Sequence, residues 1–288
     1  MSQAMARATS TAPTSASASA PTSAPSTWVL LRGLTREQGH WGDFPDQLRA
    51  ALPPGSQVIT PDLPGNGALW QTRSPASVPE MVDALRHQLQ VLGTPGPRHV
   101  LAMSLGAMVA VDWMHRHPAE VADAVLINTS LRPHSPPWRR LQPRHYPTIL
   151  RLLLTQATAK DWENAILQMT TRHPAVATET LLAHWLQLRQ RHPVATANGL
   201  RQLWAATRYQ APRSAPPVPV LLLNGEGDRL VHPSCSSVLA ASWGAPLLRH
   251  PTAGHDLPLD AGPWVVQQVL QWLAMRQPPP APMPMPPA

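Results

Sequence analysis

Ser104 stands in a setting that could make its hydroxyl a nucleophile. It lies in the segment LAMSLGA (101–107), directly after an apolar run and directly before a helical pattern. A sharp turn between a strand and a helix needs small neighbours beside the serine, and Ala102 and Gly106 supply them. Such a turn lifts the hydroxyl out of the sheet and points the helix N-terminus at any anion formed there.

A serine hydroxyl is a poor nucleophile until a base takes its proton, so Ser104 requires a histidine and an acid that orients it. Candidates for both follow later apolar runs. Asp228 lies in NGEGDRLVHP (224–233), and His255 lies in PTAGHDLP (251–258). The order serine, aspartate, histidine, each in a loop after a strand, suits a parallel sheet with a serine nucleophile. These residues predict attack on a carbonyl carbon through a covalent intermediate.

Short apolar runs alternate with amphipathic helical patterns along most of the chain. Continuously apolar runs indicate strands covered by helices on both faces. Repeated strand, helix, strand units with short links predict an α/β fold with a mostly parallel sheet of about six strands. The expected strands cover residues 28–31, 57–60, 99–102, 124–127, 218–223 and 246–249, and the expected helices cover 44–52, 79–92, 106–116 and 263–275.

The alternation breaks once, between residues 133 and 217, where only helical patterns occur. An insertion of about 85 residues is too long for a simple connection. It predicts a helical cap over the strand ends, inserted into a core formed by residues 28–132 and 218–276. The helical patterns in this insertion cover residues 146–156, 160–169, 178–189 and 195–207.

The two ends of the chain differ in composition from the rest. Residues 1–27 are rich in Ser, Ala and Pro, and residues 277–288 are rich in Pro. Neither segment can bury enough apolar surface to offset its ordering entropy, so both are expected to be disordered tails. The first segment also lacks the apolar stretch of a secretory signal, which makes a cytoplasmic location the expectation.

The composition fits a folded protein, with 43% apolar and 14% charged residues among 288. The net charge is +7, but the arginines are scattered rather than clustered on one element, which argues against nucleic-acid binding. Cys235 is the single cysteine, so no intrachain disulfide is possible, and it is interpreted as a small filler at a helix start. No apolar run approaches the roughly 18 to 20 residues that span a bilayer.

Four local patterns resemble the matching segments of the α/β-hydrolase superfamily, in the same order and spacing. The resemblance covers about residues 28–275 and implies a capped, esterase-like serine hydrolase fold. Many members have an antiparallel hairpin before the first of these patterns, and this chain is expected to lack it. The four patterns are RGL (32–34), DLPGNG (62–67), the serine turn (101–107), and the pair of GEGD (225–228) with GH (254–255).

The resemblance implies a role for each site residue. Ser104 attacks the substrate carbonyl, and His255 accepts the proton and returns it to the leaving group. Asp228 orients the imidazole and balances its charge. The backbone N–H groups of Leu34 and Leu105 are expected to form the oxyanion hole, where one donor typically contributes roughly 3 to 4 kcal/mol to transition-state stabilisation.

Gly33, Gly106 and Arg32 are expected to support this site. Arg32 stands where the family usually has a histidine. It is interpreted as holding the loop through its own hydrogen bonds, and the alternative is that it brings positive charge near the pocket. Ala102 stands where the family usually has a glycine and adds one methyl group.

Other polar residues have competing interpretations. Glu226, two residues before Asp228, is the alternative acid. Asp256 and Asp260 are expected to cap the turn and helix that follow His255. Asp62 is expected to hold a tight turn by accepting backbone hydrogen bonds. The thirteen histidines include no HExxH spacing, and a single cysteine cannot form a CxxC pair, so no metal site is expected.

The predicted activity is hydrolysis of a carboxylic ester of a small acyl substrate, with no cofactor. The same triad could instead cleave a thioester, an amide or the carbon–carbon bond of a β-diketone. A third possibility is a ligand-binding or signalling protein that retains the pocket and turns over little. The tryptophans and arginines of residues 133–217 are interpreted as packing and surface, with an acyl carrier or thioester cofactor as an alternative partner.

Overall fold

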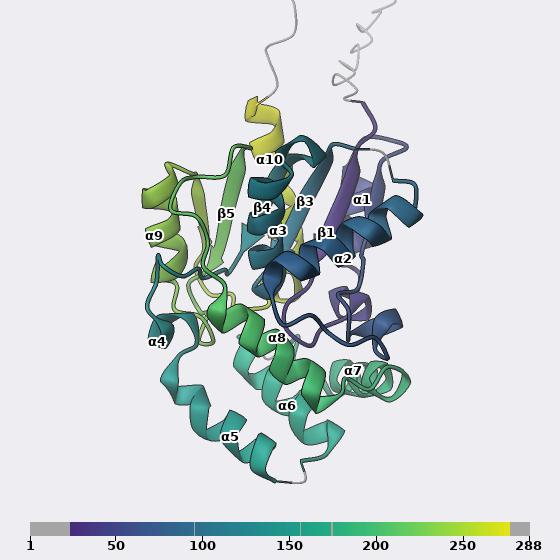
Figure 1. Ribbon diagram of the computed structural model, residues 1–288, viewed down its shortest axis with the longest axis vertical. Helices are drawn as coiled ribbons and strands as arrows, with labels where there is room; N and C mark the ends of the chain where they lie inside the picture. The colour runs from purple at the N-terminus through teal and green to yellow at the C-terminus, as the bar shows by residue number, and fades with distance from the viewer. Residues whose placement is uncertain (1–23, 95, 156, 174, 277–288) are drawn as a thin grey trace, which may run out of the picture.

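The computed structural model describes residues 24–94, 96–155, 157–173 and 175–276. At its centre is a six-stranded sheet in the order β2-β1-β3-β4-β5-β6, in which every neighbouring pair is parallel (Figure 1). This confirms the predicted α/β class and the strand number. The strands are β1 (Thr27–Leu31), β2 (Gln57–Ile59), β3 (Arg98–Met103), β4 (Val121–Ile127), β5 (Val220–Gly225) and β6 (Leu247–His250).

Both predicted tails fall mostly outside the described residues. Residues 1–23 and 277–288 are not described, and Thr27, the last residue of the expected first tail, begins β1. Within the described part of the chain no antiparallel strand precedes β1. Among the described residues the first strand is therefore β1, and the RGL pattern directly follows it.

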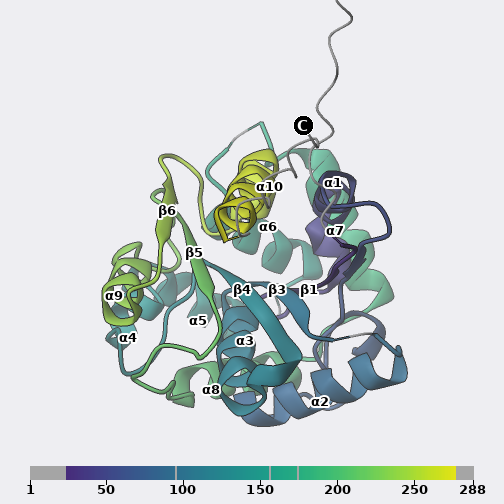
Figure 2. The ribbon, with the colours of Figure 1, turned by 90° about the horizontal axis from the view of Figure 1, so that it is seen from above.

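The central strands are apolar on both faces because helices cover both faces. In β1, Val29 packs with Leu85 in one core, while Trp28 and Leu30 pack with Leu48 in the other. Figure 2 shows α1 and α10 on one side of the sheet and α2 and α3 on the opposite side. The bounds of these helices and of α9 are α1 (Phe44–Ala51), α2 (Val78–Val91), α3 (Leu105–Arg116), α9 (Ser234–Trp243) and α10 (Leu257–Arg276).

Both ends of α2 follow local chemistry. The Ser77 hydroxyl accepts the backbone N–H of Glu80 at the start of α2, and Gly93 follows its end with φ +61°. The last helix begins earlier than expected, at Leu257, because a short turn precedes the predicted start and is separated from it by the non-helical Ala261. Pro263, near this kink, suits the first turn of a helix but not its interior.

Between β4 and β5 the described chain forms helices and loops, with one isolated β-bridge between Arg132 and Gln210. We call α4 to α8 the helical insertion. Figure 1 shows it beyond the carboxyl ends of the strands. Its helices are α4 (Pro137–Arg140), α5 (Tyr146–Leu154), α6 (Ala159–Thr170), α7 (Glu179–Arg191) and α8 (Thr196–Arg208).

A buried ion network fastens the helical insertion to the core. Arg36, in the loop after β1, donates to the Glu163 carboxylate of α6 at 2.5 Å, and Arg189 of α7 donates to the same carboxylate at 2.9 Å. The Arg36 guanidinium also lies 4.5 Å from the ring centre of Trp185. Burial lowers the pKa of Arg36, and Glu163 opposes that shift. The insertion is therefore held at a fixed place over the loop.

A second ion pair ties two helices of the core together. The Glu120 carboxylate, in the turn after α3, accepts hydrogen bonds from Arg86 of α2 at 2.6 to 3.1 Å. It also accepts the indole N–H of Trp113 in α3 at 2.8 Å. The hydrogen bonds from Arg86 lower the pKa of Glu120 from 4.5 to about 2. The folded chain therefore holds this carboxylate in its charged form.

This lowered pKa predicts a pH-dependent contribution to stability. The contribution is complete above the ordinary glutamate pKa of 4.5 and disappears as the pH falls toward about 2. We expect Glu120→Gln to lower the free energy of unfolding by about 1 kcal/mol near neutral pH, after allowing for solvent screening. Thermal unfolding followed by circular dichroism checks this. A difference between variant and wild type that stays constant down to pH 2 would contradict it.

Candidate active site

Ser104 is the single residue between β3 and α3. Its backbone has φ +53° and ψ −119°, a conformation that side-chain-bearing residues rarely adopt. The neighbouring glycine makes this turn possible. A Cβ atom on Gly106 would lie 2.5 Å from the carbonyl oxygen of Leu31 and 2.6 Å from that of Arg32. The serine is thus raised at the strand end while the start of α3 packs closely against the end of β1.

Asp228 and His255, expected as acid and base, lie together in the fold. Asp228 Oδ2 is 2.8 Å from His255 Nδ1, and each residue is 3% exposed. The second carboxylate oxygen of Asp228 accepts the backbone N–H groups of Leu230 and Val231 at 2.9 and 3.0 Å. A carboxylate can only accept, so Nδ1 carries a proton, and in the neutral imidazole Nε2 is then left as an acceptor. Glu226, the alternative acid, is exposed, and it is Asp228 that contacts the histidine.

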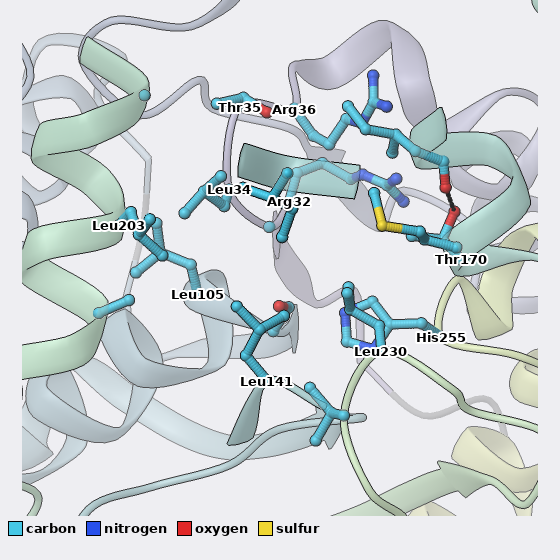
Figure 3. A pocket seen from close by; sticks show the side chains of 18 of the residues that line it. Arg32, Leu34, Thr35, Arg36, Leu105, Leu141, Thr170, Leu203, Leu230 and His255 are labelled. Atoms are coloured by element: carbon cyan, nitrogen blue, oxygen red, sulfur yellow. Dashed lines mark hydrogen bonds between the residues drawn. The ribbon is translucent and has the colours of Figure 1, made fainter. Parts of the chain in front are cut away.

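Ser104 and His255 line one cavity of about 380 Å³, and Leu34 and Leu105 line it as well. Figure 3 shows Leu34 and Leu105 on one side of this space and His255 across from them. Gly33 brings the loop after β1 close to the nucleophile, since a Cβ atom on it would lie 3.2 Å from Ser104 Cβ. The structure therefore gathers the expected nucleophile, base and backbone donors at one cavity. Asp228 holds the imidazole but does not line the cavity.

The helical insertion supplies much of the cavity wall. Its contribution is largely apolar, while the core supplies the polar residues beside Ser104. A cavity of this size with apolar walls and few polar groups is typical of a small-molecule site. The apolar wall residues of the insertion include Leu141, Ile149, Leu153, Ile166, Met169 and Leu203.

Arg32 forms a buried ion pair with Asp256. Its Nη1 and Nη2 atoms donate to the two carboxylate oxygens at 3.1 and 2.6 Å, and the side chains are 5% and 4% exposed. The guanidinium also lies 4.7 Å from the ring centre of Trp41. Arg32 thus holds its loop through its own hydrogen bonds, and its charge is matched by Asp256 although it lines the cavity.

The expectation that Asp256 and Asp260 cap the following turn and helix is wrong. The Asp256 carboxylate binds the arginine just described. The Asp260 carboxylate accepts the backbone N–H groups of Gly254 and Arg172 at 2.7 and 2.9 Å, and it also accepts the Thr171 hydroxyl. Asp260 therefore joins the end of α6 to the histidine loop. Local sequence could not show this, because two of its partners lie 88 and 89 residues away.

Asp62 behaves as expected in the loop after β2. Its carboxylate accepts the backbone N–H groups of Gln38 and Ala68 at 2.7 and 2.9 Å. Gly67 has φ +48°, and a Cβ atom there would lie 2.0 Å from the Asp62 carboxylate. The aspartate and glycine of the DLPGNG pattern thus form a tight turn, and the turn is a structural feature of the loop.

Asn128, which the sequence did not single out, joins the two loops that carry Asp228 and His255, the expected acid and base. Its Nδ2 donates to the carbonyl oxygens of Gly254 and His255 at 3.0 and 2.8 Å. Its Oδ1 accepts from Asn224 Nδ2 at 2.8 Å and from the backbone N–H of Gly225 at 3.0 Å. The side chain is fully buried, and both its nitrogen and its oxygen are hydrogen-bonded. The available signal was a polar residue placed directly after a continuously apolar run.

Within the residues that the structure describes, no group of three or more histidine, cysteine or carboxylate side chains could hold a metal ion. The helices of the described segments are also all too short or too polar to cross a bilayer.

Removing the Asn128 side chain tests its bridging role. Asn128→Ala leaves buried carbonyl and N–H groups without partners, and alanine tolerates the positive φ of this position less well than asparagine. We expect the free energy of unfolding to fall by about 2 kcal/mol or more in urea titrations. Asn164→Ala, at an exposed position on α6, is the matched control and should change stability by less than about 0.5 kcal/mol. Equal losses in the two variants would contradict the bridging role.

The fold matches solved structures over most of the chain. Rv0554 from Mycobacterium tuberculosis superposes with a TM-score of 0.71 at 22% identity, covering 88% of this chain and 92% of that one. An esterase from Thermogutta terrifontis superposes with a TM-score of 0.67 at 21% identity, covering 88% and 91%. At such identities the likeness shows the fold alone.

Sequence comparison identifies the family. Pimeloyl-[acyl-carrier protein] methyl ester esterase of Aromatoleum aromaticum is 31% identical in an alignment 250 residues long, which covers 79% of this chain and 90% of that protein. Cis-3-alkyl-4-alkyloxetan-2-one decarboxylase of Xanthomonas campestris is 30% identical over 105 residues, 35% of each chain. A family model described as the α/β hydrolase family matches residues 28–268. This chain therefore belongs to the α/β-hydrolase family.

Proposed function

We propose that this protein is a serine hydrolase that cleaves a carboxylic ester through an acyl-enzyme on Ser104. His255 is the general base, and Asp228 is the acid that orients it. The observation that carries the proposal is the buried hydrogen bond of 2.8 Å between Asp228 and His255, made beside a cavity that Ser104 also lines. The family membership and the esterase relative support it.

The reaction follows from the protonation states that this geometry favours. His255 Nε2 takes the Ser104 proton as Oγ attacks the ester carbon, and the carbonyl electron pair moves onto oxygen. The backbone N–H groups of Leu34 and Leu105 stabilise that oxyanion. When the intermediate collapses, the alcohol leaves with the proton from His255. Water then attacks the acyl-enzyme with the same base and releases the carboxylic acid and free Ser104.

We further propose that the helical insertion, within residues 133–217, is a cap that selects the acyl group. Its apolar side chains form much of the cavity wall, so transfer of an alkyl chain from water into the cavity is favourable, about 0.8 kcal/mol for each buried CH₂ group. The ion network on Glu163 holds this wall over Ser104. An apolar acyl chain is therefore the expected occupant.

We propose, more specifically, that the acyl chain is attached to an acidic carrier, because the exposed surface of the insertion is basic. The relative from Aromatoleum aromaticum is named for a methyl ester carried by an acyl carrier protein. The insertion has three carboxylate side chains, at Asp161, Glu163 and Glu179, of which Glu163 is buried in the ion network. Its exposed arginines form no ion pair with a carboxylate among the described residues. They are Arg139, Arg144, Arg151, Arg191 and Arg208.

Apolar side chains on two helices of the insertion are exposed as well. Leu150 and Leu154 of α5 are 55% and 77% exposed, and Leu200 of α8 is 47% exposed and also lines the cavity. A face that is both apolar and basic, next to the cavity, suits an acidic carrier whose acyl chain enters between these helices. We propose this face as the carrier contact.

Covalent labelling tests the assignment of Ser104. We expect a fluorophosphonate probe to form one adduct on Ser104 of the folded wild type, detected by peptide mass spectrometry, and Ser104→Ala to lose both the adduct and ester turnover. Loss of turnover should reach at least about 10³-fold, because the nucleophile carries the covalent step. Unchanged turnover in Ser104→Ala would refute the proposal. Rates on matched ester, thioester, amide and β-diketone substrates distinguish the alternative bonds.

Charge reversal on the insertion tests the carrier contact. We expect Arg144→Glu with Arg151→Glu to lower kcat/KM by about tenfold for an acyl methyl ester on a carrier protein, because an attractive contact becomes repulsive. The same variant should leave kcat/KM for the free methyl ester unchanged. Arg49→Glu on α1 is the control, since Arg49 is exposed on a core helix. An equal loss on both substrates, or none on either, would argue against the contact.

A further inference from the structure

The ion pair between Arg32 and Asp256 joins two parts of the site that lie 224 residues apart in the chain. Arg32 directly follows β1 and precedes Gly33 and Leu34, whose backbone forms the side of the cavity near Ser104. Asp256 directly follows His255. The pair therefore links the loop of the proposed oxyanion donor to the loop of the proposed base.

Both partners are committed to this one interaction. Each Asp256 carboxylate oxygen accepts from one Arg32 nitrogen, and among the described residues the Arg32 Nε atom is buried without a hydrogen-bond partner. The Trp41 ring lies against the guanidinium, which fixes its plane. Two parallel hydrogen bonds between planar groups define both a distance and an orientation. The distance between the two loops is therefore set by the fork of hydrogen bonds as well as by the attraction of opposite charges.

The main chain of Asp256 is held from the other side as well. Its N–H donates to the carbonyl oxygen of Thr170, at the end of α6, at 2.9 Å. The histidine loop is thus attached to the helical insertion through its backbone and to the β1 loop through its side chain. Removing the side-chain contact leaves the backbone contact in place, so the loop can keep its fold while its position relative to Leu34 is released.

We propose that Asp256 is a positioning residue that, through its paired hydrogen bonds with Arg32, sets the place of the His255 imidazole relative to the oxyanion donor at Leu34. This inference rests on the function proposed above for Ser104 and His255. The base acts on the Ser104 proton and the oxyanion donor acts on the oxygen of the carbonyl under attack, both in the same step. A shift of one against the other therefore lowers the rate of the chemical step more than it weakens substrate binding.

Replacing the whole pair separates positioning from stability. A buried ion pair can often be replaced by apolar side chains of similar size without loss of stability, whereas removing one partner leaves a buried charge. We expect Arg32→Met with Asp256→Leu to keep the melting temperature within a few degrees of wild type. We expect its kcat on a p-nitrophenyl ester to fall by roughly 10- to 100-fold, with KM changed by less than about threefold. The rate of fluorophosphonate labelling at Ser104 should fall in parallel.

Arg32→Lys provides a second variant. It keeps the opposite charges but offers a single point charge in place of the planar fork. We expect an intermediate loss of kcat with unchanged KM, and this variant decides the question if the double variant does not fold. A kcat equal to that of wild type in the folded variant would overturn the proposal, because charge attraction alone would then be sufficient.

The control removes a bidentate ion pair far from the cavity. Arg86→Met with Glu120→Gln breaks the link between α2 and the turn after α3 and keeps an acceptor for the Trp113 indole. Its kcat should equal that of wild type, and an equal loss there would overturn the positioning role. If the wild type itself is not labelled at Ser104, both the proposed function and this inference fail. A labelled wild type with full kcat in the Arg32 and Asp256 variants overturns the inference alone.

Discussion

All six strands of the sheet run in the same direction, so the loops that leave their carboxyl ends meet at one edge. This constraint brings Ser104 after β3, Asp228 after β5 and His255 after β6 into one small region, and it brings the loop after β1 beside them. Helices cover both faces of the sheet and make it rigid. The edge can therefore hold residues far apart in sequence at fixed distances.

Several polar side chains at that edge are buried and have long-range partners there. Asn128 joins the Asp228 loop to the loop of the proposed base, His255. Asp256 joins this base loop to the end of β1, and Asp260 joins it to the end of α6. A buried polar group without a partner costs about 1 to 3 kcal/mol, so these contacts resist rearrangement. The base loop is consequently fixed from three directions, which is what a site needs if it is organised before substrate arrives.

The helical insertion combines two surfaces of different chemistry. Apolar side chains of the insertion line the cavity. The buried Glu163 carboxylate forms the ion pair that attaches the insertion to Arg36 of the core. The outer side of the insertion is basic and partly apolar. The core thus supplies the polar groups beside Ser104. The insertion supplies much of the apolar cavity wall and the basic, partly apolar surface outside it.

Much of this architecture could be predicted from the sequence. All six strands fall within three residues of their expected bounds. In an α/β fold a short, continuously apolar run between turn residues is typical of a strand that helices cover on both faces. Ser104, Asp228 and His255 could be proposed as site residues because each has recognisable neighbours in the sequence, and the structure places Ser104 and His255 at one cavity and Asp228 against His255. The start of α10 was missed, since the turn before its kink carries no helical periodicity.

Only the tertiary structure decided the partners of the buried polar side chains. Arg32 and Asp256 are 224 residues apart, and Asn128 and His255 are 127 apart, so no local pattern connects them. The sequence suggested that Asp256 and Asp260 bind the nearest backbone N–H groups, but long-range partners compete successfully for both carboxylates. The physical reason is that local periodicity determines which segments form strands and helices, whereas the pairing of buried charges depends on which loops the folded sheet brings together.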